Sequence, residues 1–495
     1  MQYAASSLST EVELRPHAAC LLCLLACCDR LSGVEADALA QPHVADALTA
    51  CLTALPPLVD GDVNESADTA PAQSASSRQS MTPSQRVAAV MPRLTTALRR
   101  ARAPLSPREA SQPLAMALLV CDVGCSLPGG GPADSTPRGR FKALLHASGA
   151  LSGICTHAHE AASAIVATGG TQAADANVTA LVDAAAVRLL RCTRVLEHVC
   201  FEAEECAQHV LSWPATGMQT ETPAAGASTA NGSAAGQLLP AVCGCLAPLA
   251  ARTAMPSAPP SVGTAMRSAL AVVTNVTNER PQAAAALLAC GGVATLAQLL
   301  RPLAEVVLPP PGSGVAGSEP GGSAHGLSAH ADALNAALCA LANVAEVCPE
   351  AATALGQGEH LTFVATLFAR AHALTNSLAD GSSGAGAMDA ADGDGDDVTL
   401  EELDAAERSG AAAILSAYCA LLLACLLHAA VKAGANVGAA AASTVAQCQA
   451  DGGLDAVVVT VERFLVFHSR INNSLTATAE TTLLEAIRGM QAWQR

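Results

Sequence analysis

The residue types that carry chemistry in proteins are thinly spread along this sequence. Its 13 histidines are scattered, and the closest approach to a metal site is THAHE, Thr156 to Glu160. His157 and His159 are two residues apart, a spacing that places them on different faces of a helix. We therefore do not expect this pair to bind one metal ion.

Two other segments imitate metal-binding motifs. Cys20 and Cys23 form a C-x-x-C pair, but no second pair or His pair follows at the spacing of a zinc finger. Read from Ala390, ADGDGDDVTLEE fits a calcium loop at several positions, including Glu401 at position twelve. Position one is Ala390 and position eight is Asp397, where such loops have Asp and an apolar residue. An acidic loop leading into the helix LEELDAAERSG is the better interpretation.

The other kinds of catalytic motif are missing from the sequence. The glycines of ATGGTQ and PGGGP have no preceding strand and no Lys-Ser/Thr pair, so neither segment matches a phosphate-binding loop. No nucleophile stands beside a recognisable base. We expect a protein that works by binding rather than an enzyme, with no catalytic residue, metal ion or cofactor.

VERFLVFH, Val461 to His468, is unusual because it contains two of the chain's six phenylalanines. On a helix, Val461, Phe464 and His468 share an apolar stripe with residues of the preceding turns, and Phe467 lies at its edge. The stripe predicts a core helix whose phenylalanines fill the last layer of a helical array. Glu462 and Arg463 point the other way and are candidate partner contacts.

Composition predicts an all-α fold. Hydrophobic residues make up 51% of the 495 residues, mostly Ala, Leu and Val, while aromatic residues make up 2%, which favours Ala/Leu helices over packed sheets. The 19 cysteines lie within apolar runs and are expected to be buried thiols in a reducing compartment. The opening MQYAASSLSTEVEL contains two glutamates, so no secretory signal is expected.

The net charge of −17 argues against direct binding of nucleic acid. One segment departs from this balance, because six arginines and no acidic residue lie between Arg86 and Arg108. Two interpretations stay open for this segment: a solvated basic helix face, or a docking patch for an acidic partner. The candidate contacts are Arg93, Arg99, Arg100 and Arg102.

The run from Ala411 to Val431 contains no Asp, Glu, Lys or Arg and is long enough to span a membrane. About half of it is Ala, Ser, Cys, Tyr or His, which gain little from hydrocarbon. A helix buried on most sides within a helical array is the better interpretation, and no membrane partner is expected.

Four low-complexity segments separate the helical blocks. Rich in Gly, Pro, Ser and Asp, they are expected to be flexible loops, because such residues bury too little surface to offset the entropy of ordering. The loops are 61–85, 215–237, 309–330 and 379–399. We expect residues 1–495 to form one domain.

The helical blocks between these loops repeat one pattern. LAVVTNVTNERPQAAAAL (270–287) and LCALANVAEVCPEAATAL (338–355) share an apolar run, an Asn, and a Pro six residues later. A weaker copy at 190–211 has His198 and Glu204 at these two positions. The pattern predicts a helix, a polar turn and a second helix that begins at proline, as in armadillo and HEAT arrays. The polar residues at these turns, which cap helices or face a partner, are Asn275, Asn278, Glu279, Asn343 and Glu346.

Five of these blocks, in order, resemble the wings-apart-like (WAPL) cohesin release factors. They include RFKALLHASGALSGI, CTRVLEHVCFEAEECAQHVL, VVTNVTNERPQAAAALLACGGVATLAQLL and ALCALANVAEVCPEAATAL. The closing ILSAYCALLLACLL and VVVTVERFLVFHSRINN are similar to the family's last segments. Animal members carry Phe-Gly-Phe docking tripeptides before this domain, and the sequence contains none.

The resemblance implies an elongated HEAT/armadillo-like α-solenoid that binds cohesin in the nucleus, on chromatin. The implied partners are the kleisin, the HEAT-repeat accessory subunits and the SMC ATPase head. Binding would favour the open ring and release cohesin, which regulates sister chromatid cohesion through mitosis and meiosis. A generic adaptor for an unrelated protein is the alternative hypothesis, and an enzyme with an unrecognised site is the third.

Overall fold

The computed structural model describes residues 113–125, 136–169, 176–201, 203–213, 238–308, 324–357, 359–384, 400–448, 453–471 and 477–494. Within these ranges every regular element is an α-helix and no strand occurs. The prediction of an all-α chain is therefore confirmed for the described residues.

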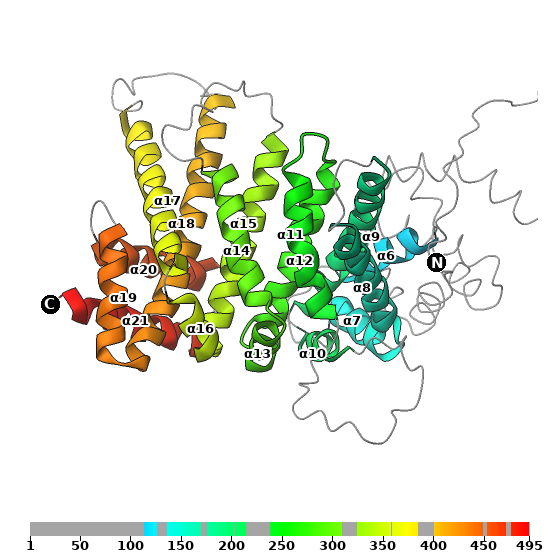
Figure 1. Ribbon diagram of the computed structural model, residues 1–495, viewed down its shortest axis with the longest axis horizontal. Coiled ribbons are helices and arrows are strands. Elements are labelled where there is room, and N and C mark those ends of the chain that lie inside the picture. Colours follow the sequence, from blue (N-terminus) through cyan, green and yellow to red (C-terminus); the bar gives the residue numbers. More distant parts are fainter. Residues whose placement is uncertain are drawn as a thin grey trace, which may run out of the picture. The chain divides into compact units, whose positions relative to one another are not determined.

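The helices follow one another along the chain with short turns between many of them (Figure 1). The first five are α6 (Pro113–Cys125), α7 (Pro137–Ala147), α8 (Ala150–Gly169), α9 (Ala176–Cys200) and α10 (Glu204–Ser212). The next six are α11 (Leu238–Thr253), α12 (Pro260–Thr277), α13 (Pro281–Ala289), α14 (Gly292–Val307), α15 (Ala324–Val347) and α16 (Pro349–Leu355). The last five are α17 (Glu359–Gly384), α18 (Leu400–Ala433), α19 (Ala435–Cys448), α20 (Gly453–Ile471) and α21 (Ala477–Gln494).

Proline begins the second helix of each of the two best sequence repeats, as the pattern predicted. Pro281 begins α13 and Pro349 begins α16. The preceding residues, Arg280 and Cys348, are both extended, with φ and ψ of −117° and 96°, and −128° and 96°. A proline excludes the helical conformation from the residue before it, so each proline ends one helix and starts the next.

The helices group into two compact units. Unit 1 contains the described residues of 1–158 and 194–210, and unit 2 those of 159–193 and 211–495. In unit 1, α6 packs against α7, and Phe141 and Leu145 of α7 are fully buried. The expectation of one domain over 1–495 stays a prediction.

In unit 2 the repeats pack against one another through equivalent helices. The long helix α12 packs against α15, and α15 packs against α18. The preceding helices follow the same order, because α11 contacts α14 and α14 contacts α17 (Figure 1). The short helices α13 and α16 also touch. Each helix of one repeat therefore packs against the equivalent helix of the next repeat.

Helix α18 is surrounded by six others: α15, α16, α17, α19, α20 and α21. Six consecutive residues, Leu422 to Leu427, are each at most 3% exposed, and six consecutive positions face every direction around a helix. Residues Ser409–Ala433 are long and apolar enough to cross a membrane, and 61% of the most apolar window is buried. A second span would require the bent pair α13 and α14, whose axes differ by 79°. Other helices of the protein therefore cover most of the apolar run in α18.

Two predicted loops are shorter than the sequence suggested. Helix α15 begins at Ala324, inside the segment 309–330, and α17 continues to Gly384, inside 379–399. Proline last occurs at Pro320 in the first segment, so nothing that strongly opposes a helix remains after it. In the second, the long preceding helix lowers the cost of adding further turns.

The prediction that both phenylalanines of VERFLVFH are core residues is wrong for Phe467, which is 60% exposed. Val457 and Val461 of the predicted stripe are fully buried, and Phe464 is half-buried, 6.2 Å from the Tyr418 ring. At about 100° per residue, Phe467 lies roughly 120° away from Val461 around the helix, which takes it off the buried stripe. The side chain of His468 lies outside the described part of the structure.

Replacing Leu423 with Ala tests the central position of α18. Leu423 is fully buried, and we expect the substitution to lower the free energy of unfolding by about 2–5 kcal/mol because it leaves a cavity. The matched control is Ile414→Ala on the same helix, where the side chain is 51% exposed and the expected change is within about 0.5 kcal/mol. Urea unfolding followed by circular dichroism measures both. Equal effects would contradict the assignment of α18 to the core.

Candidate functional site

The polar residues predicted at the repeat turns lie at the ends of α12 and α15, in unit 2. We refer to Asn275, Asn278, Glu279, Asn343 and Glu346 as the turn cluster. Glu462 and Arg463 lie elsewhere, on α20. The basic patch residues Arg93, Arg99, Arg100 and Arg102 lie outside the described residues, so their role as partner contacts stays a prediction.

The carbonyls at the end of α12 accept hydrogen bonds from the residues that directly follow the helix. Asn278 is the C-cap, and its backbone N–H donates to the Thr274 carbonyl at 3.1 Å. The guanidinium Nη1 of Arg280 donates to the Asn275 carbonyl at 2.7 Å. A cation at a helix C-terminus also interacts favourably with the helix dipole. The contribution of Asn275 here comes from its backbone carbonyl.

Glu279 adopts an unusual backbone conformation. Its φ is 55°, and it is the one non-glycine residue with positive φ in the described part of the chain. The left-handed region costs an ordinary residue roughly 1 kcal/mol or more. The side chain is exposed. The turn therefore presents a carboxylate to solvent at a position that glycine would occupy with less strain.

Asn343 links the two repeats. Its side-chain Nδ2 on α15 donates to the Thr274 carbonyl on α12 at 3.1 Å. The Thr274 hydroxyl in turn donates to the Ala336 carbonyl of α15 at 3.1 Å. Of the two roles left open by the sequence, Asn343 therefore has a structural one, since it adds a hydrogen bond between helices to a carbonyl that already accepts the Asn278 N–H.

Glu346 and Glu279 bring negative charge to the same end of these helices. Burial raises the pKa of the Glu346 carboxyl above its ordinary value, and the charge of Glu279 raises it further. Like charges disfavour the ionised form of each other. The turn cluster is therefore an acidic surface in which one carboxylate is exposed and the other is half-buried.

Glu462 and Arg463 are exposed on α20, as predicted. The positive charge of Arg463 acts on His372 of α17, whose pKa is lowered first by burial and then by this charge. His372 stacks on Phe368 with ring centroids 5.3 Å apart. Arg463 therefore lies close enough to α17 to influence a partly buried ring, while Glu462 faces solvent.

The histidines of THAHE have separate surroundings. His157 is buried, and the ring of His159 lies 5.7 Å from that of Trp213. Among the described residues, no group of three or more His, Cys, Asp or Glu side chains could hold a metal ion. The residues of the calcium-like segment up to 399 lie outside the described part of the chain.

A serine and a histidine that the sequence did not connect come together in unit 1. The Ser152 hydroxyl and His209 Nε2 are 3.0 Å apart, and the rings of His209 and His146 meet edge to face at 5.1 Å. Burial lowers the pKa of His209, and the neighbouring His146 lowers it further. A partly buried neutral imidazole that hydrogen-bonds a hydroxyl is a common packing arrangement, and Ser152 also lies within a helix rather than on an exposed turn.

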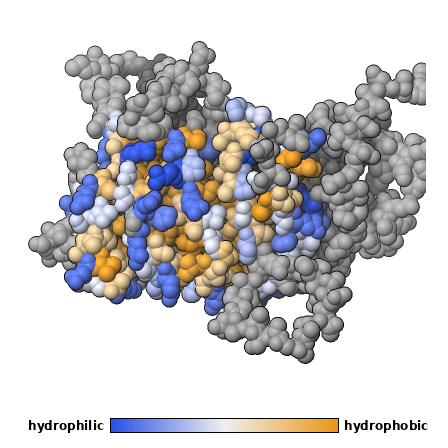
Figure 2. Space-filling model, in the orientation of Figure 1, coloured by the Kyte–Doolittle hydropathy of each residue, from blue (hydrophilic) through white to orange (hydrophobic). Residues whose placement is uncertain are grey.

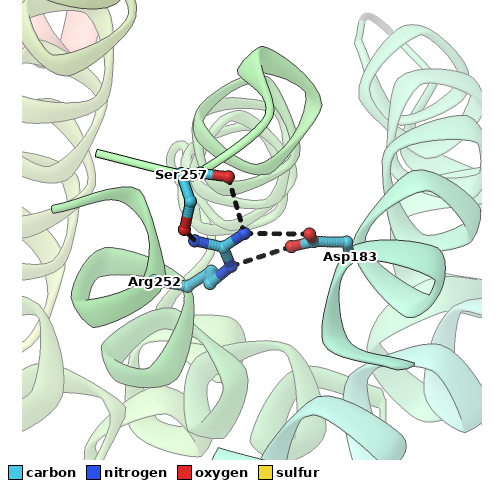
Figure 3. A network of polar contacts seen from close by, with 3 residues as sticks. All are labelled: Asp183, Arg252 and Ser257. Carbon is cyan, nitrogen blue, oxygen red and sulfur yellow. Dashed lines mark hydrogen bonds and ion pairs between the residues drawn. The ribbon is translucent and has the colours of Figure 1, made fainter. Parts of the chain in front are cut away.

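An arginine that the sequence analysis did not single out forms a polar network in unit 2 with Asp183 and Ser257 (Figure 3). The Arg252 guanidinium of α11 binds the Asp183 carboxylate of α9 in a bidentate pair, with both N–O distances 2.9 Å. It also donates to the Ser257 carbonyl at 2.9 Å and hydroxyl at 3.3 Å. Arg252 is only 6% exposed. The one sign of this network in the sequence is Asp183, an acidic residue within the Ala-rich helix α9.

The cysteines of the described helices are mainly buried thiols, as expected. Burial raises the pKa of Cys192 and Cys245 to about 12. Desolvation disfavours the thiolate, so such cysteines are inert. Cys290 departs from this rule, because its pKa is lowered to about 6.

Comparison with known proteins leaves the family open. No family model and no curated protein matches the chain. Among solved structures, the chain is similar to an engineered protein from the Northeast Structural Genomics Consortium, with 13% identity over 99% of this chain and 98% of that one. The TM-score is 0.28, so this likeness carries no argument about fold or function. What the described residues define is a class: an all-α chain of packed helices.

Replacing Arg252 with Lys tests the network of Figure 3. Lysine keeps the charge but cannot form the bidentate pair, so we expect the free energy of unfolding to fall by about 2–4 kcal/mol. Arg488→Lys, at an exposed position on α21, is the control and should change it by less than about 0.5 kcal/mol. Thermal unfolding of both variants gives the comparison. Equal stabilities would show that the network contributes little.

The lowered pKa of His209 predicts a local loss of stability in acid. Because the folded state holds this proton less tightly than the unfolded chain, whose reference value is 6.5, stability falls as the pH drops from above 6.5 through the folded pKa. An NMR titration of the His209 ring should have its midpoint below 6.5. The change in melting temperature between neutral and mildly acidic pH should be smaller for His209→Gln than for the unchanged chain, with His360→Gln as the control. A midpoint at or above 6.5 would overturn the prediction.

Proposed function

We propose that this chain is a binding protein of the HEAT/armadillo-like α-solenoid type that acts as a WAPL-like cohesin release factor. Three expectations belong to the proposal: a nuclear, chromatin-associated location, no chemistry of its own, and no direct contact with nucleic acid or membrane. Its partners would be the kleisin, the HEAT-repeat subunits and the SMC ATPase head. The alternative, an adaptor for an unrelated protein, shares the same architecture.

The observation that carries the proposal is the stacking of equivalent helices in unit 2. A solenoid grows by placing each repeat against the previous one, so that every repeat contacts only its neighbours. The contacts of α12 with α15 and of α15 with α18 have this order, as do those of α11 with α14 and of α14 with α17. Three of the segments that resemble the WAPL family lie in this stack: VVTNVTNERPQAAAALLACGGVATLAQLL on α12 to α14, ALCALANVAEVCPEAATAL on α15 and α16, and ILSAYCALLLACLL on α18.

The stack supports binding because successive repeats align their turns along one edge. In the turn cluster, Asn278 and Glu279 are exposed, and Glu346 is half-buried beside them. Exposed carboxylates at such an edge favour a partner surface rich in Lys and Arg. In the view of Figure 2, hydrophobic and hydrophilic residues are interspersed over the helical region, as on protein surfaces in general.

A binding protein can release cohesin only if it prefers one state of the ring. A ligand shifts a two-state equilibrium by its differential affinity for the two states. The proposal therefore requires tighter binding to the open ring than to the closed one. This requirement distinguishes a release factor from an adaptor that only holds its partner.

The test is capture of cohesin from nuclear extract by the intact chain. We expect enrichment over an unrelated helical-repeat protein, and roughly five-fold weaker capture by Glu279→Gln, equivalent to about 1 kcal/mol. Gln keeps the size of the side chain and removes its charge. The matched control is Glu305→Gln on α14, also exposed, which should capture cohesin as the unchanged chain does.

The basic patch is tested in the same experiment by reversing Arg99 and Arg100 to Glu. Weaker capture with unchanged helix content would assign the patch to partner binding, and loss of helix content would assign it to the fold. No enrichment of cohesin by the intact chain would refute the release-factor proposal and leave the adaptor. Equal capture by Glu279→Gln and Glu305→Gln would exclude the turn cluster as the contact.

A further inference from the structure

Cys243 and Cys290 are two thiols in contact at the junction of three helices in unit 2. Cys243 lies on α11 and is 2% exposed, while Cys290 lies between α13 and α14 and is partly exposed. The Cys243 thiol donates a hydrogen bond to the Cys290 sulfur. The two residues are distant in sequence, and the packing of α11 against α14 brings them together.

The backbone at this junction leaves room for the sulfur of Cys243. A Cβ added to Gly292 would lie 3.1 Å from Cys243 Sγ and 2.4 Å from Leu287 Cδ1. The glycine therefore allows the buried thiol to reach the N-terminus of α14. Gly291, the N-cap of this helix, has φ of 75°, a left-handed conformation that glycine accepts readily.

Cys290 has the surroundings of a reactive thiolate. The hydrogen bond from Cys243 is the main cause that lowers its pKa to about 6, although burial acts in the opposite direction. The backbone N–H of Gly292, at the start of α14, lowers the pKa further. As a neutral thiol, Cys290 Sγ donates to the Leu287 carbonyl at 3.3 Å, and this bond is given up on ionisation. These contacts favour the thiolate form of Cys290.

Cys243 has the opposite character. Its pKa is raised well above the ordinary value of 9.0, first by its hydrogen bond to Cys290 and then by burial. It keeps its proton while Cys290 loses one. An accessible thiolate beside a second, protonated thiol is the arrangement found in redox-sensing cysteines, where the second thiol resolves the oxidised first one.

We propose that Cys290 and Cys243 form a peroxide-sensitive thiol pair, in which Cys290 is oxidised first and Cys243 then closes a disulfide. This inference is independent of the proposed function. In the first step the ionised Cys290 sulfur attacks one oxygen of hydrogen peroxide, the O–O bond breaks, and the leaving hydroxide takes up the proton that Cys290 released on ionisation and becomes water. The sulfur becomes a sulfenic acid, and the peroxide is reduced by two electrons.

In the second step the Cys243 sulfur attacks Cys290 Sγ. The S–S bond forms, the S–O bond breaks, and the leaving hydroxide takes the Cys243 proton and becomes water. The sum is two thiols and one peroxide to one disulfide and two waters. A thiol reductant reverses the change by thiol–disulfide exchange.

The first test is the rate at which iodoacetamide alkylates individual cysteines in the full, reduced chain at pH 7. Cys448 of α19, also partly exposed, is the internal comparison. The thiolate fraction of Cys290 exceeds that of an ordinary thiol by roughly 90-fold, and its lower nucleophilicity removes most of this gain, so a roughly three- to six-fold faster reaction is expected. Equal rates, or a midpoint for Cys290 near 9, would overturn the proposal.

The second test is the product of peroxide treatment. After one equivalent of hydrogen peroxide, blocking of free thiols and proteolysis, mass spectrometry should find one peptide pair joined by a Cys243–Cys290 disulfide. Cys243→Ser keeps a hydrogen-bond donor but cannot close the disulfide, so Cys290 should stop at a sulfenic acid that dimedone traps. Cys245→Ser, a change at a buried thiol two residues away, should leave the disulfide intact.

Any other dominant disulfide, or random pairing among the 19 cysteines, would reject the pair. If Cys243→Ser does not fold, the peptide map of the unchanged chain still decides the question. Cys243→Ala removes the hydrogen-bond donor, so it should slow alkylation of Cys290 as well as prevent the disulfide. Unchanged alkylation in Cys243→Ala would show that Cys243 does not activate Cys290.

Discussion

The constraint on which the described structure depends is the burial of α18. A helix whose residues from Leu422 to Leu427 are all apolar cannot present any of its sides to water without cost. Six neighbouring helices cover it. Since Ala and Cys are small, these neighbours approach closely, and the packing gains area through many short contacts rather than through a few large aromatic residues. The aromatic content of 2% is a consequence of this way of building a core.

Hydrogen bonds and ion pairs between helices then select one arrangement among the many that apolar packing allows. Ala/Leu surfaces fit one another in several registers, because small side chains form shallow ridges and grooves. The bidentate pair of Arg252 with Asp183 and the bond from Asn343 to the Thr274 carbonyl each require one register. If these polar groups were buried without their partners, the free energy lost by desolvation would exceed that gained from nearby apolar contacts. Such polar contacts are few, but each fixes the position of a whole helix.

The same logic places reactive and interactive groups at junctions between helices. A helix end leaves backbone groups unpaired, and side chains near it acquire unusual conformations or pKa values. Glu279 has its left-handed backbone at the end of α12, and Cys290 has its lowered pKa before α14. Residues in the middle of the helices, such as Cys192 and Cys245, are inert by comparison. The repeat turns therefore carry the features with which this chain can respond to a partner or an oxidant.

The sequence by itself determined the all-α class, the helix starts at Pro281 and Pro349, and the burial of the apolar run in α18. These are local properties, set by proline geometry, residue propensity and hydrophobic pattern. It also predicted the turn cluster, but not that Asn343 bonds to the neighbouring repeat, and it placed Phe467 wrongly. Only the tertiary structure decided the pairing of Arg252 with Asp183, of Ser152 with His209 and of Cys243 with Cys290. Each joins residues about 50 or more positions apart, and no local pattern specifies which helix faces which until the helices pack.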